Sequence, residues 1–274
     1  MGLRVNTNLF SMTAQKNLAV VTNRLQANFA RLSSGLRIAT AADDAAGLAI
    51  SERMRAQIRS YAAAGRNTQD GISLVQTAEG ALTESGANLI RMRELAIQAA
   101  NGTLNTGDRA TLDSEFKDLI AEIDRVADQT DFNGIQLLDG TTGTVNIQVG
   151  TESGETLVIT LADMTDAGLG LSGAGFDLLT TTNASTALTT IDTAIDSLTD
   201  FRAVLGAKQQ QLQSAVRSIA TTQINLAAAE SRIRDVDIAF ETADLTRNTI
   251  LQQAAISVLT QANIQPQLAL SLLA

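Results

Sequence analysis

The chain has 274 residues, a net charge of −9, and 45% hydrophobic but only 3% aromatic residues. It contains no Cys and no His, which excludes disulfides, thiol chemistry and the commonest protein ligands of zinc and copper. A single Pro and few aromatic side chains favour long helices with thin apolar seams over a thick globular core.

Charge is unevenly distributed along the sequence. Residues 1–66 carry nine Lys or Arg and three Asp or Glu, whereas residues 67–200 carry five and twenty-one. The basic segment almost lacks the aromatic side chains that stack on bases, so we expect no nucleic-acid partner. No stretch approaches the roughly 18 apolar residues of a membrane span, so we expect no membrane insertion. Residues 1–17 also lack the apolar core and cleavage site of a secretory signal peptide.

The first expected helix runs from Val5 to about Leu32. Its apolar residues recur at helical spacing, namely Leu18, Val21, Leu25, Phe29 and Leu32. Residues 33–35, Ser-Ser-Gly, then loosen the helix. Either Asp43 or Asp44 can cap the next helix through its side-chain oxygen.

Two helices are expected in the next part of the chain. The first has its seam at Val75, Ala78, Leu82, Ser85, Leu89, Met92, Ala96 and Ala99, and Asn101-Gly102 ends it. The second has its seam at Leu112, Phe116, Leu119, Ile123 and Val126. Because the connection is short, the sequence predicts that these two helices are antiparallel.

The hydrophobic period changes between about residues 131 and 171. The segment FNGIQLLDG is rich in turn residues, and TVNIQVG and ETLVITLA alternate apolar and polar residues. This alternation predicts a β-hairpin. An isolated hairpin is marginally stable, so we expect it to lie on the helices.

The longest seam extends from Ile191 to Phe240 at steps of three and four residues. It comprises Ile191, Ala194, Leu198, Phe201, Leu205, Lys208, Leu212, Ala215, Ile219, Thr222, Leu226, Ala229, Ile233, Val236 and Phe240. A period of 3.5 held over this length predicts one rod on the order of 75 Å that packs against partner helices. Gly206 lies inside it and costs up to about 1 kcal/mol relative to Ala, so packing must hold the helix together.

The last expected helix follows Phe240 and carries no charge after Arg247. Its apolar seam comprises Leu251, Ala255, Val258 and Ala262, widened by Ile256 and Leu259. Such an uncharged helix needs a helical partner, and we expect the N-terminal helix to supply it.

Several long segments closely resemble bacterial flagellin, the subunit of the flagellar filament. They are VNTNLFSMTAQKNL, RLSSGLRIATAADDAAGLAISERM, NTQDGISLVQTAEGALTE, RMRELAIQAANGT, DFNGIQLLDG and SRIRDVDIAFETADLTRNTILQQAAISVLTQANIQPQLALSLL. The resemblance covers about residues 1–140 and 200–274. It implies a mainly α fold, a long-helix coiled-coil bundle formed by the N- and C-terminal halves. A small β-hairpin region completes that fold, with no large inserted domain.

The resemblance also implies a division of the chain into three regions. Residues 1–42 and 236–274 would be paired terminal helices that form the inner coiled coil of the filament. Residues 43–130 and 176–235 would form the helical bundle of the outer core, and residues 131–175 the attached hairpin and loops. The expected self-assembly seam then comprises Leu18, Val21, Leu25, Leu32, Leu251, Val258 and Leu259.

Partners and location follow from the same resemblance. The protein would be extracellular, in the flagellar filament, and would assemble with itself into a helical homopolymer. It would be exported by the flagellar type III export apparatus with an export chaperone, and would meet hook-associated and cap proteins. No cofactor and no metal site are expected.

One surface resembles the site by which the vertebrate Toll-like flagellin receptor detects flagellins. By residue-to-residue matching, that site would comprise Arg91, Leu95, Gln98 and Glu115. Ile90 stands where the receptor-activating pattern has Gln. The plainer interpretation is that Arg91 and Glu94 form a solvated helix face, which side-chain pairs of about 0.2–0.5 kcal/mol stabilise.

Two other classes of protein compete with this interpretation. An enzyme is disfavoured because the chain has no imidazole base, no thiol and no Gly-rich phosphate loop after a strand, so no catalytic residue can be named. A hook–filament junction protein or a secreted coiled-coil translocator would share the export route and the helical ends. The segments RLSSGLRI and NIQPQLALSLL match filament subunits better.

Overall fold

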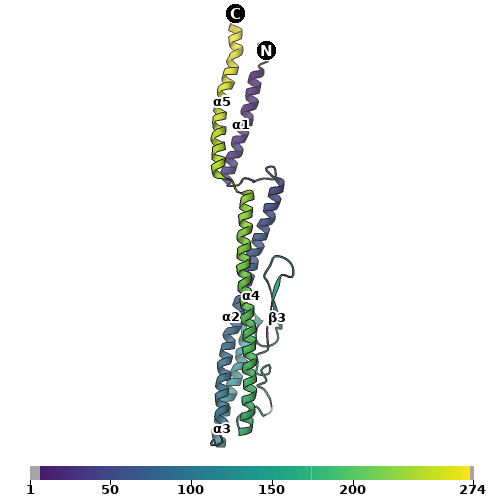
Figure 1. Cartoon of the computed structure of the whole chain (residues 1–274), viewed down its shortest axis with the longest axis vertical. Helices are drawn as coiled ribbons and strands as arrows, with labels where there is room; N and C mark the ends of the chain where they lie inside the picture. Colours follow the sequence, from purple (N-terminus) through teal and green to yellow (C-terminus); the bar gives the residue numbers. More distant parts are fainter. Residues whose placement is uncertain (1–6, 174, 272–274) are drawn as a thin grey trace. The chain divides into compact units, whose positions relative to one another are not determined.

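The computed structural model describes residues 7–173 and 175–271 and confirms a mainly α fold (Figure 1). Two compact units are present, one made of residues 1–58 and 224–274 and the other of residues 59–223. The helices are α1 (Leu9–Ser34), α2 (Ala45–Ala99), α3 (Thr106–Gln129), α4 (Thr181–Arg234) and α5 (Ile238–Ser271). The strands are β1 (Asp131–Phe132), β2 (Ile135–Gln136), β3 (Thr144–Gln148) and β4 (Thr156–Thr160).

Helix α1 has a defined cap at each end. Its N-terminus is capped by Asn8, whose Oδ1 accepts a hydrogen bond from the Ser11 amide at 3.1 Å. Residues 5 and 6, where this helix was expected to begin, lie outside the described residues. At the other end Gly35 adopts φ 72° and donates its N–H to the Arg31 carbonyl at 2.8 Å. The Ser-Ser-Gly segment thus ends the helix as expected, because glycine takes this left-handed conformation without a steric cost.

The two aspartates that precede α2 have different roles. Asp44 caps the helix, since its Oδ1 accepts from the Gly47 amide at 2.9 Å. Asp43 Oδ2 instead accepts from the amides of Ala39 and Thr40, at 3.3 and 3.0 Å, and so closes the preceding turn. These hydrogen bonds, of which the one from Thr40 has the largest effect, lower the pKa of the Asp43 carboxyl. The structure therefore assigns the cap to Asp44.

The predicted continuous helix from Ile191 to Phe240 is wrong at its C-terminal end. Helix α4 stops at Arg234, and Asp235 forms an antiparallel bridge with Leu36. Asp237 then caps α5, because its Oδ1 accepts from the amides of Ala239 and Phe240, at 3.0 and 3.1 Å. The sequence periodicity continues through the break, but backbone bonds to residues 35–37 compete with the helix there.

In the unit of residues 59–223, α2 and α3 form the expected antiparallel hairpin. Asn105 and Asp108 make a capping box at the start of α3. Arg109 reaches back to the last turn of α2, where its Nε donates to the Ala99 carbonyl at 3.0 Å. The core of this unit includes the fully buried side chains Leu82, Leu89, Met92, Phe116, Ile123 and Ile191.

The α4 seam completes that core. Its positions in this unit are buried at Ile191, Ala194, Leu198, Phe201, Leu205, Leu212 and Ile219, while Lys208 is half-buried. Asp113 of α3 is also buried and holds the segment before α4. Its Oδ1 accepts from the Leu178 amide at 2.8 Å, and its Oδ2 lies 2.6 Å from Lys117 Nζ. The hydrogen bond that Lys117 donates to Asp113, aided by the negative charge of that carboxylate, raises the pKa of Lys117.

The predicted hairpin is present as β3 and β4, paired antiparallel with Val145 opposite Ile159. A second, smaller hairpin pairs β1 with β2 around the Asn133-Gly134 turn. Ile159 is fully buried, and Ile147 packs against the helical core. Gly71 of α2 permits this approach, since a Cβ there would lie 3.1 Å from Ile147 Cγ1. The hairpin thus lies on the helices, as expected.

Candidate assembly and recognition surfaces

Helices α1 and α5 lie side by side and antiparallel (Figure 1). At one end Asn8 Nδ2 donates to the Ala262 carbonyl at 2.8 Å, and at the other the Leu36–Asp235 bridge joins the segment after α1 to the segment before α5. Of the four N-terminal positions predicted for the assembly seam, Leu25 is buried, and Leu18, Val21 and Leu32 are half-buried. These four side chains recur along one stripe of α1.

The C-terminal residues of the predicted seam do not all point toward α1, as the sequence suggested they would. Leu259 is half-buried, but Leu251 and Val258 are 42% and 60% exposed. Helix α1 therefore does not cover Leu251 and Val258 within one chain, and their part in the self-assembly seam stays a prediction. The buried positions of α5 are instead Glu241, Asn248 and Ala262.

A buried polar cluster between α1 and α5 was missed from the sequence. Asn28 on α1 bonds to Glu241 and Asn248 on α5, and all three are buried. A signal was available, because the three-and-four spacing of Leu18, Val21 and Leu25 lands on Asn28. The sequence interpretation took the apolar neighbour Phe29 in its place, yet Phe29 is exposed.

Large apolar side chains remain uncovered on both helices of this pair. The exposed set on α1 is Leu9, Phe10, Met12, Val20 and Phe29, and on α5 it is Ile238, Phe240, Ile250, Leu251, Ile256, Val258 and Ile264. Exposed apolar surface of this extent marks a contact site for another molecule. The pair α1–α5 therefore presents a candidate assembly surface.

A second candidate surface joins α2 to α3. The Arg91 guanidinium donates to Glu115 Oε1 from Nη2 at 2.7 Å and from Nε at 2.9 Å, and its Nη1 bonds to Glu94 at 3.0 Å. The bonds to Glu115 and then Glu94 raise the pKa of Arg91. Because all three side chains are about half exposed, solvent screens these pairs and they contribute little to stability.

The four residues predicted for receptor recognition do not all reach the surface. Arg91, Gln98 and Glu115 are exposed. Leu95 is only 1% exposed and belongs to the core of the unit. Leu95 therefore adds no exposed side chain to this surface in this conformation, and its contact with the receptor stays a prediction.

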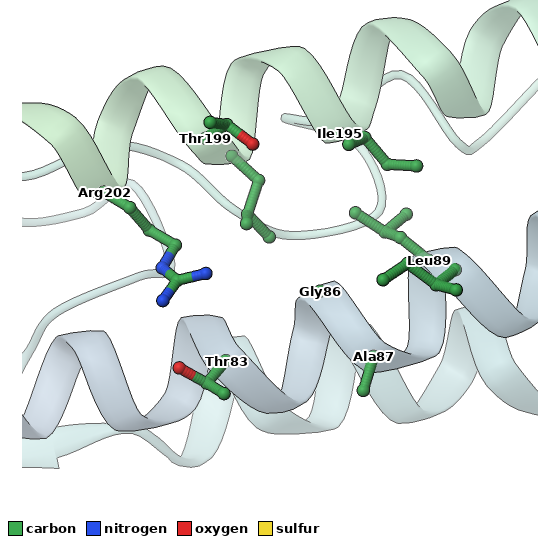
Figure 2. Close-up of a pocket in the computed structure, with 9 residues that line it drawn as sticks. Thr83, Gly86, Ala87, Leu89, Ile195, Thr199 and Arg202 are labelled. Carbon is green, nitrogen blue, oxygen red and sulfur yellow. The ribbon is translucent and has the colours of Figure 1, made fainter.

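A shallow groove of about 280 Å³ lies between α2 and α4 in the same unit (Figure 2). Leu89, Ile90 and Ile195 form part of its apolar lining, and Arg202 extends into it from α4 (Figure 2). The Arg202 guanidinium lies 3.7 Å from the Glu79 carboxylate. Arg202 is the one titratable side chain of the lining, so the groove offers packing surface rather than a general acid or base.

Comparison with known proteins matches both ends of the chain to one family. The family model described as the bacterial flagellin N-terminal helical region matches residues 5–143, and the one described as the C-terminal helical region matches residues 188–273. The chain belongs to the bacterial flagellin family. Flagellin is the structural subunit of the flagellar filament, so the family is one of structural proteins and not of enzymes.

Individual flagellins align over nearly the whole chain. The flagellin of Halalkalibacterium halodurans is 48% identical over 98% of this chain and 99% of its own length. That of Bacillus subtilis is 42% identical over 99% of this chain and its own full length. The crystal structure of Bacillus cereus flagellin has 37% identity and a TM-score of 0.51, covering 60% of this chain and 94% of its own.

These matches confirm the family resemblance and the absence of a large inserted domain. Between the two family-model matches, the described residues 144–173 and 175–187 hold β3, β4, the loops beside them and the start of α4. Within residues 7–173 and 175–271, no helix combines the length and apolar character that crossing a membrane requires.

Proposed function

We propose that this flagellin polymerises through the uncovered apolar faces of α1 and α5 into a helical, extracellular filament used for swimming. The observation that carries the proposal is α5 itself, which has no charged residue after Arg247 and exposes apolar side chains on more than one side. A helix that is apolar all round is stable only when it is covered on all sides. Since α1 covers one side, neighbouring subunits must cover the rest.

In this proposal the three regions of the chain have separate tasks. Residues 1–42 and 236–274 supply the inner contacts between subunits, and the expected seam residues act there. Residues 43–130 and 176–235 form the outer helical bundle, with residues 131–175 attached to it. Because a helical filament grows without closing, the contacts must join unlike surfaces of adjacent subunits.

Export by the flagellar type III apparatus with a chaperone, and contacts with hook-associated and cap proteins, complete the proposal. Family membership supports this route. The absence of Cys also suits a chain that is threaded unfolded, since no disulfide has to be kept open on the way.

Seeded growth tests the assembly proposal. Short filament fragments should be extended by the soluble chain into polymer that sediments, and limited proteolysis should trim residues 1–40 and 240–274 from the soluble chain but spare them in the polymer. The reason is that α1 and α5, paired with each other but with apolar faces uncovered, unfold locally more readily than the same helices confined by neighbouring subunits. Failure of the seeds to grow, or equal protection of both ends in the two forms, would contradict the proposal.

We also propose that the surface formed by Arg91, Gln98 and Glu115 binds the vertebrate Toll-like flagellin receptor. The three side chains are exposed, and the Arg91–Glu115 bond joins two helices into one polar patch. A fixed Arg beside an acceptor is a frequent anchor of protein interfaces.

For this surface the decisive variant is Arg91→Ala, measured by activation of a receptor reporter cell line. Loss of one interface anchor should raise the half-maximal concentration about tenfold or more. Arg93→Ala is the matched control, since Arg93 is exposed on the same helix and bonds to Asp192 at 2.7 Å. A chain that activates equally with and without Arg91, or one that is silent from the start, rules the site out.

A further inference from the structure

Three polar side chains are buried in the seam between α1 and α5, where apolar residues are the rule. Asn28, Glu241 and Asn248 are 4%, 5% and 3% exposed. The other buried positions described for these two helices are Ser11, Ala14, Leu25 and Ala262, of which only Leu25 is large and apolar. The polar cluster is therefore a main part of the interface and not an interruption of an apolar one.

Hydrogen bonds between the two helices satisfy this cluster. Asn28 Nδ2 donates to Glu241 Oε1 at 2.7 Å, and Asn28 Oδ1 accepts from Asn248 Nδ2 at 3.1 Å. Asp244 Oδ2 lies within 3.3 Å of Asn28 Nδ2 and 3.2 Å of Asn248 Nδ2. The Arg31 guanidinium lies 3.9 Å from the Glu241 carboxylate. Asn28 of α1 thus both donates to Glu241 and accepts from Asn248 of α5, and the arrangement is complementary in one relative orientation of the helices.

Apolar burial alone would favour a different face of α5. At about 100° per residue, rotating α5 by about 60–80° would bring Leu251 and Val258 toward α1 in place of Asn248. Those two side chains are larger and more apolar than the ones now buried, yet they remain exposed. The rotated pair would separate Asn28 from Glu241 and Asn248 and leave buried polar groups without partners.

We propose that Asn28, Glu241 and Asn248 are the specificity determinants that select the face through which α1 and α5 pair. By holding this face inward, the cluster keeps the apolar face with Leu251 and Val258 outward. A parallel pairing of two α5 helices through the same face would bring Glu241 and Asp244 against their own copies, so like charges disfavour it. Buried polar residues fix register and partner in coiled coils in the same way, at a cost in stability.

The last consequence, an apolar face left free for neighbouring subunits, rests on the proposed function. The choice of pairing face does not, and it can be measured separately. The natural chain has no Cys, so introduced cysteine pairs report on contacts without background. Ser11→Cys with Asn263→Cys reports the observed face, because Ser11 Oγ donates to Asn263 Oδ1 at 2.8 Å. Ser11→Cys with Gln261→Cys reports a different face at the same level of the helix.

The intrachain disulfide yields of the two cysteine pairs are compared in the full chain. The comparison is made in two samples, the soluble chain in ammonium sulfate solution and the pelleted polymer. In the parent sequence we expect the observed-face pair to exceed the other by at least about tenfold, the discrimination that one unsatisfied buried polar group provides. In the variant Asn28→Leu/Glu241→Leu/Asn248→Leu that ratio should fall to near one. The thermal stability of the full chain should be unchanged or raised, since apolar replacement of a buried polar set is often stabilising.

Two further variants separate complementarity from simple packing. Asn28→Asp places a third carboxylate beside Glu241 and Asp244 and should lower the observed-face yield. Adding Glu241→Gln returns an amide donor opposite the carboxylate and should restore most of that yield. A parent ratio near one, a triple-leucine variant that keeps the parent ratio, or an Asn28→Asp defect that Glu241→Gln does not relieve would each overturn the proposal. If the ratio behaves as expected but no polymer forms, the pairing inference holds and the assembly function fails.

Discussion

Replacing Val258 with Asp is expected to abolish seeded filament growth while leaving the unit of residues 59–223 folded. Val258 is 60% exposed on α5, away from the face that contacts α1, so its side chain is available to a neighbouring subunit. Burying an unpaired carboxylate in a dry interface costs on the order of 3 kcal/mol or more, which raises the critical concentration by at least about a hundredfold. Sedimentation of polymer after seeding, over a range of chain concentrations, measures this shift.

Val258→Thr is the matched control for shape. Thr has nearly the same volume and carries no charge, so we expect growth to be weakened far less, by about tenfold or under. Leu259→Asp provides the second comparison, because Leu259 is half-buried. That change should also stop growth, but by breaking the pair with α1, and should therefore remove the Ser11–Asn263 cross-link that Val258→Asp retains. Normal growth of Val258→Asp would show that the exposed face of α5 is not covered in the filament.

The second large effect is expected for Leu95→Ala, which should destabilise the unit of residues 59–223 by about 2–5 kcal/mol. Leu95 is 1% exposed and lies in the core that α2 shares with α3 and α4. Its truncation leaves a cavity that rigid neighbouring helices cannot fill. For a unit of this size each kcal/mol lowers the melting temperature by about 2–4 °C, so thermal denaturation followed by circular dichroism reports the loss.

The control for this change is Ile97→Ala, two residues further along α2. Ile97 is 50% exposed, so its truncation should alter stability by no more than about 0.5 kcal/mol. If Leu95→Ala melts at the parent temperature, the burial described here is not that of the folded chain in solution. If Leu95→Ala lowers receptor activation, we expect that loss to track its loss of stability. The loss of activation caused by Arg91→Ala should not depend on stability.

The sequence by itself determined the class of fold, the order of its elements and the family. Apolar residues at three-and-four spacing define a helix irrespective of its partner, so α1, α2, α3 and most of α4 lie where the spacing predicts them. The change to a period of two located the β3–β4 hairpin for the same reason. Local capping chemistry also acts within a few residues, which is why Gly35 and the pair Asp43 and Asp44 could be identified as helix boundaries.

Only the tertiary structure decided which face of each helix is buried and where the longest one ends. The seam through Val236 is as regular as before it, yet α4 stops at Arg234 because residues 35–37, nearly 200 positions away in the chain, bond to the backbone there. Periodicity identifies an apolar stripe but not its partner, so it placed Leu251 and Val258 inward and could not show that Leu95 is covered by neighbouring helices. Which face of α5 packs against α1 depends on hydrogen bonds between Asn28 and residues more than 200 positions away. Such bonds exist only once the two ends of the chain have met, because a polar side chain within an apolar stripe is unfavourable until its partner arrives.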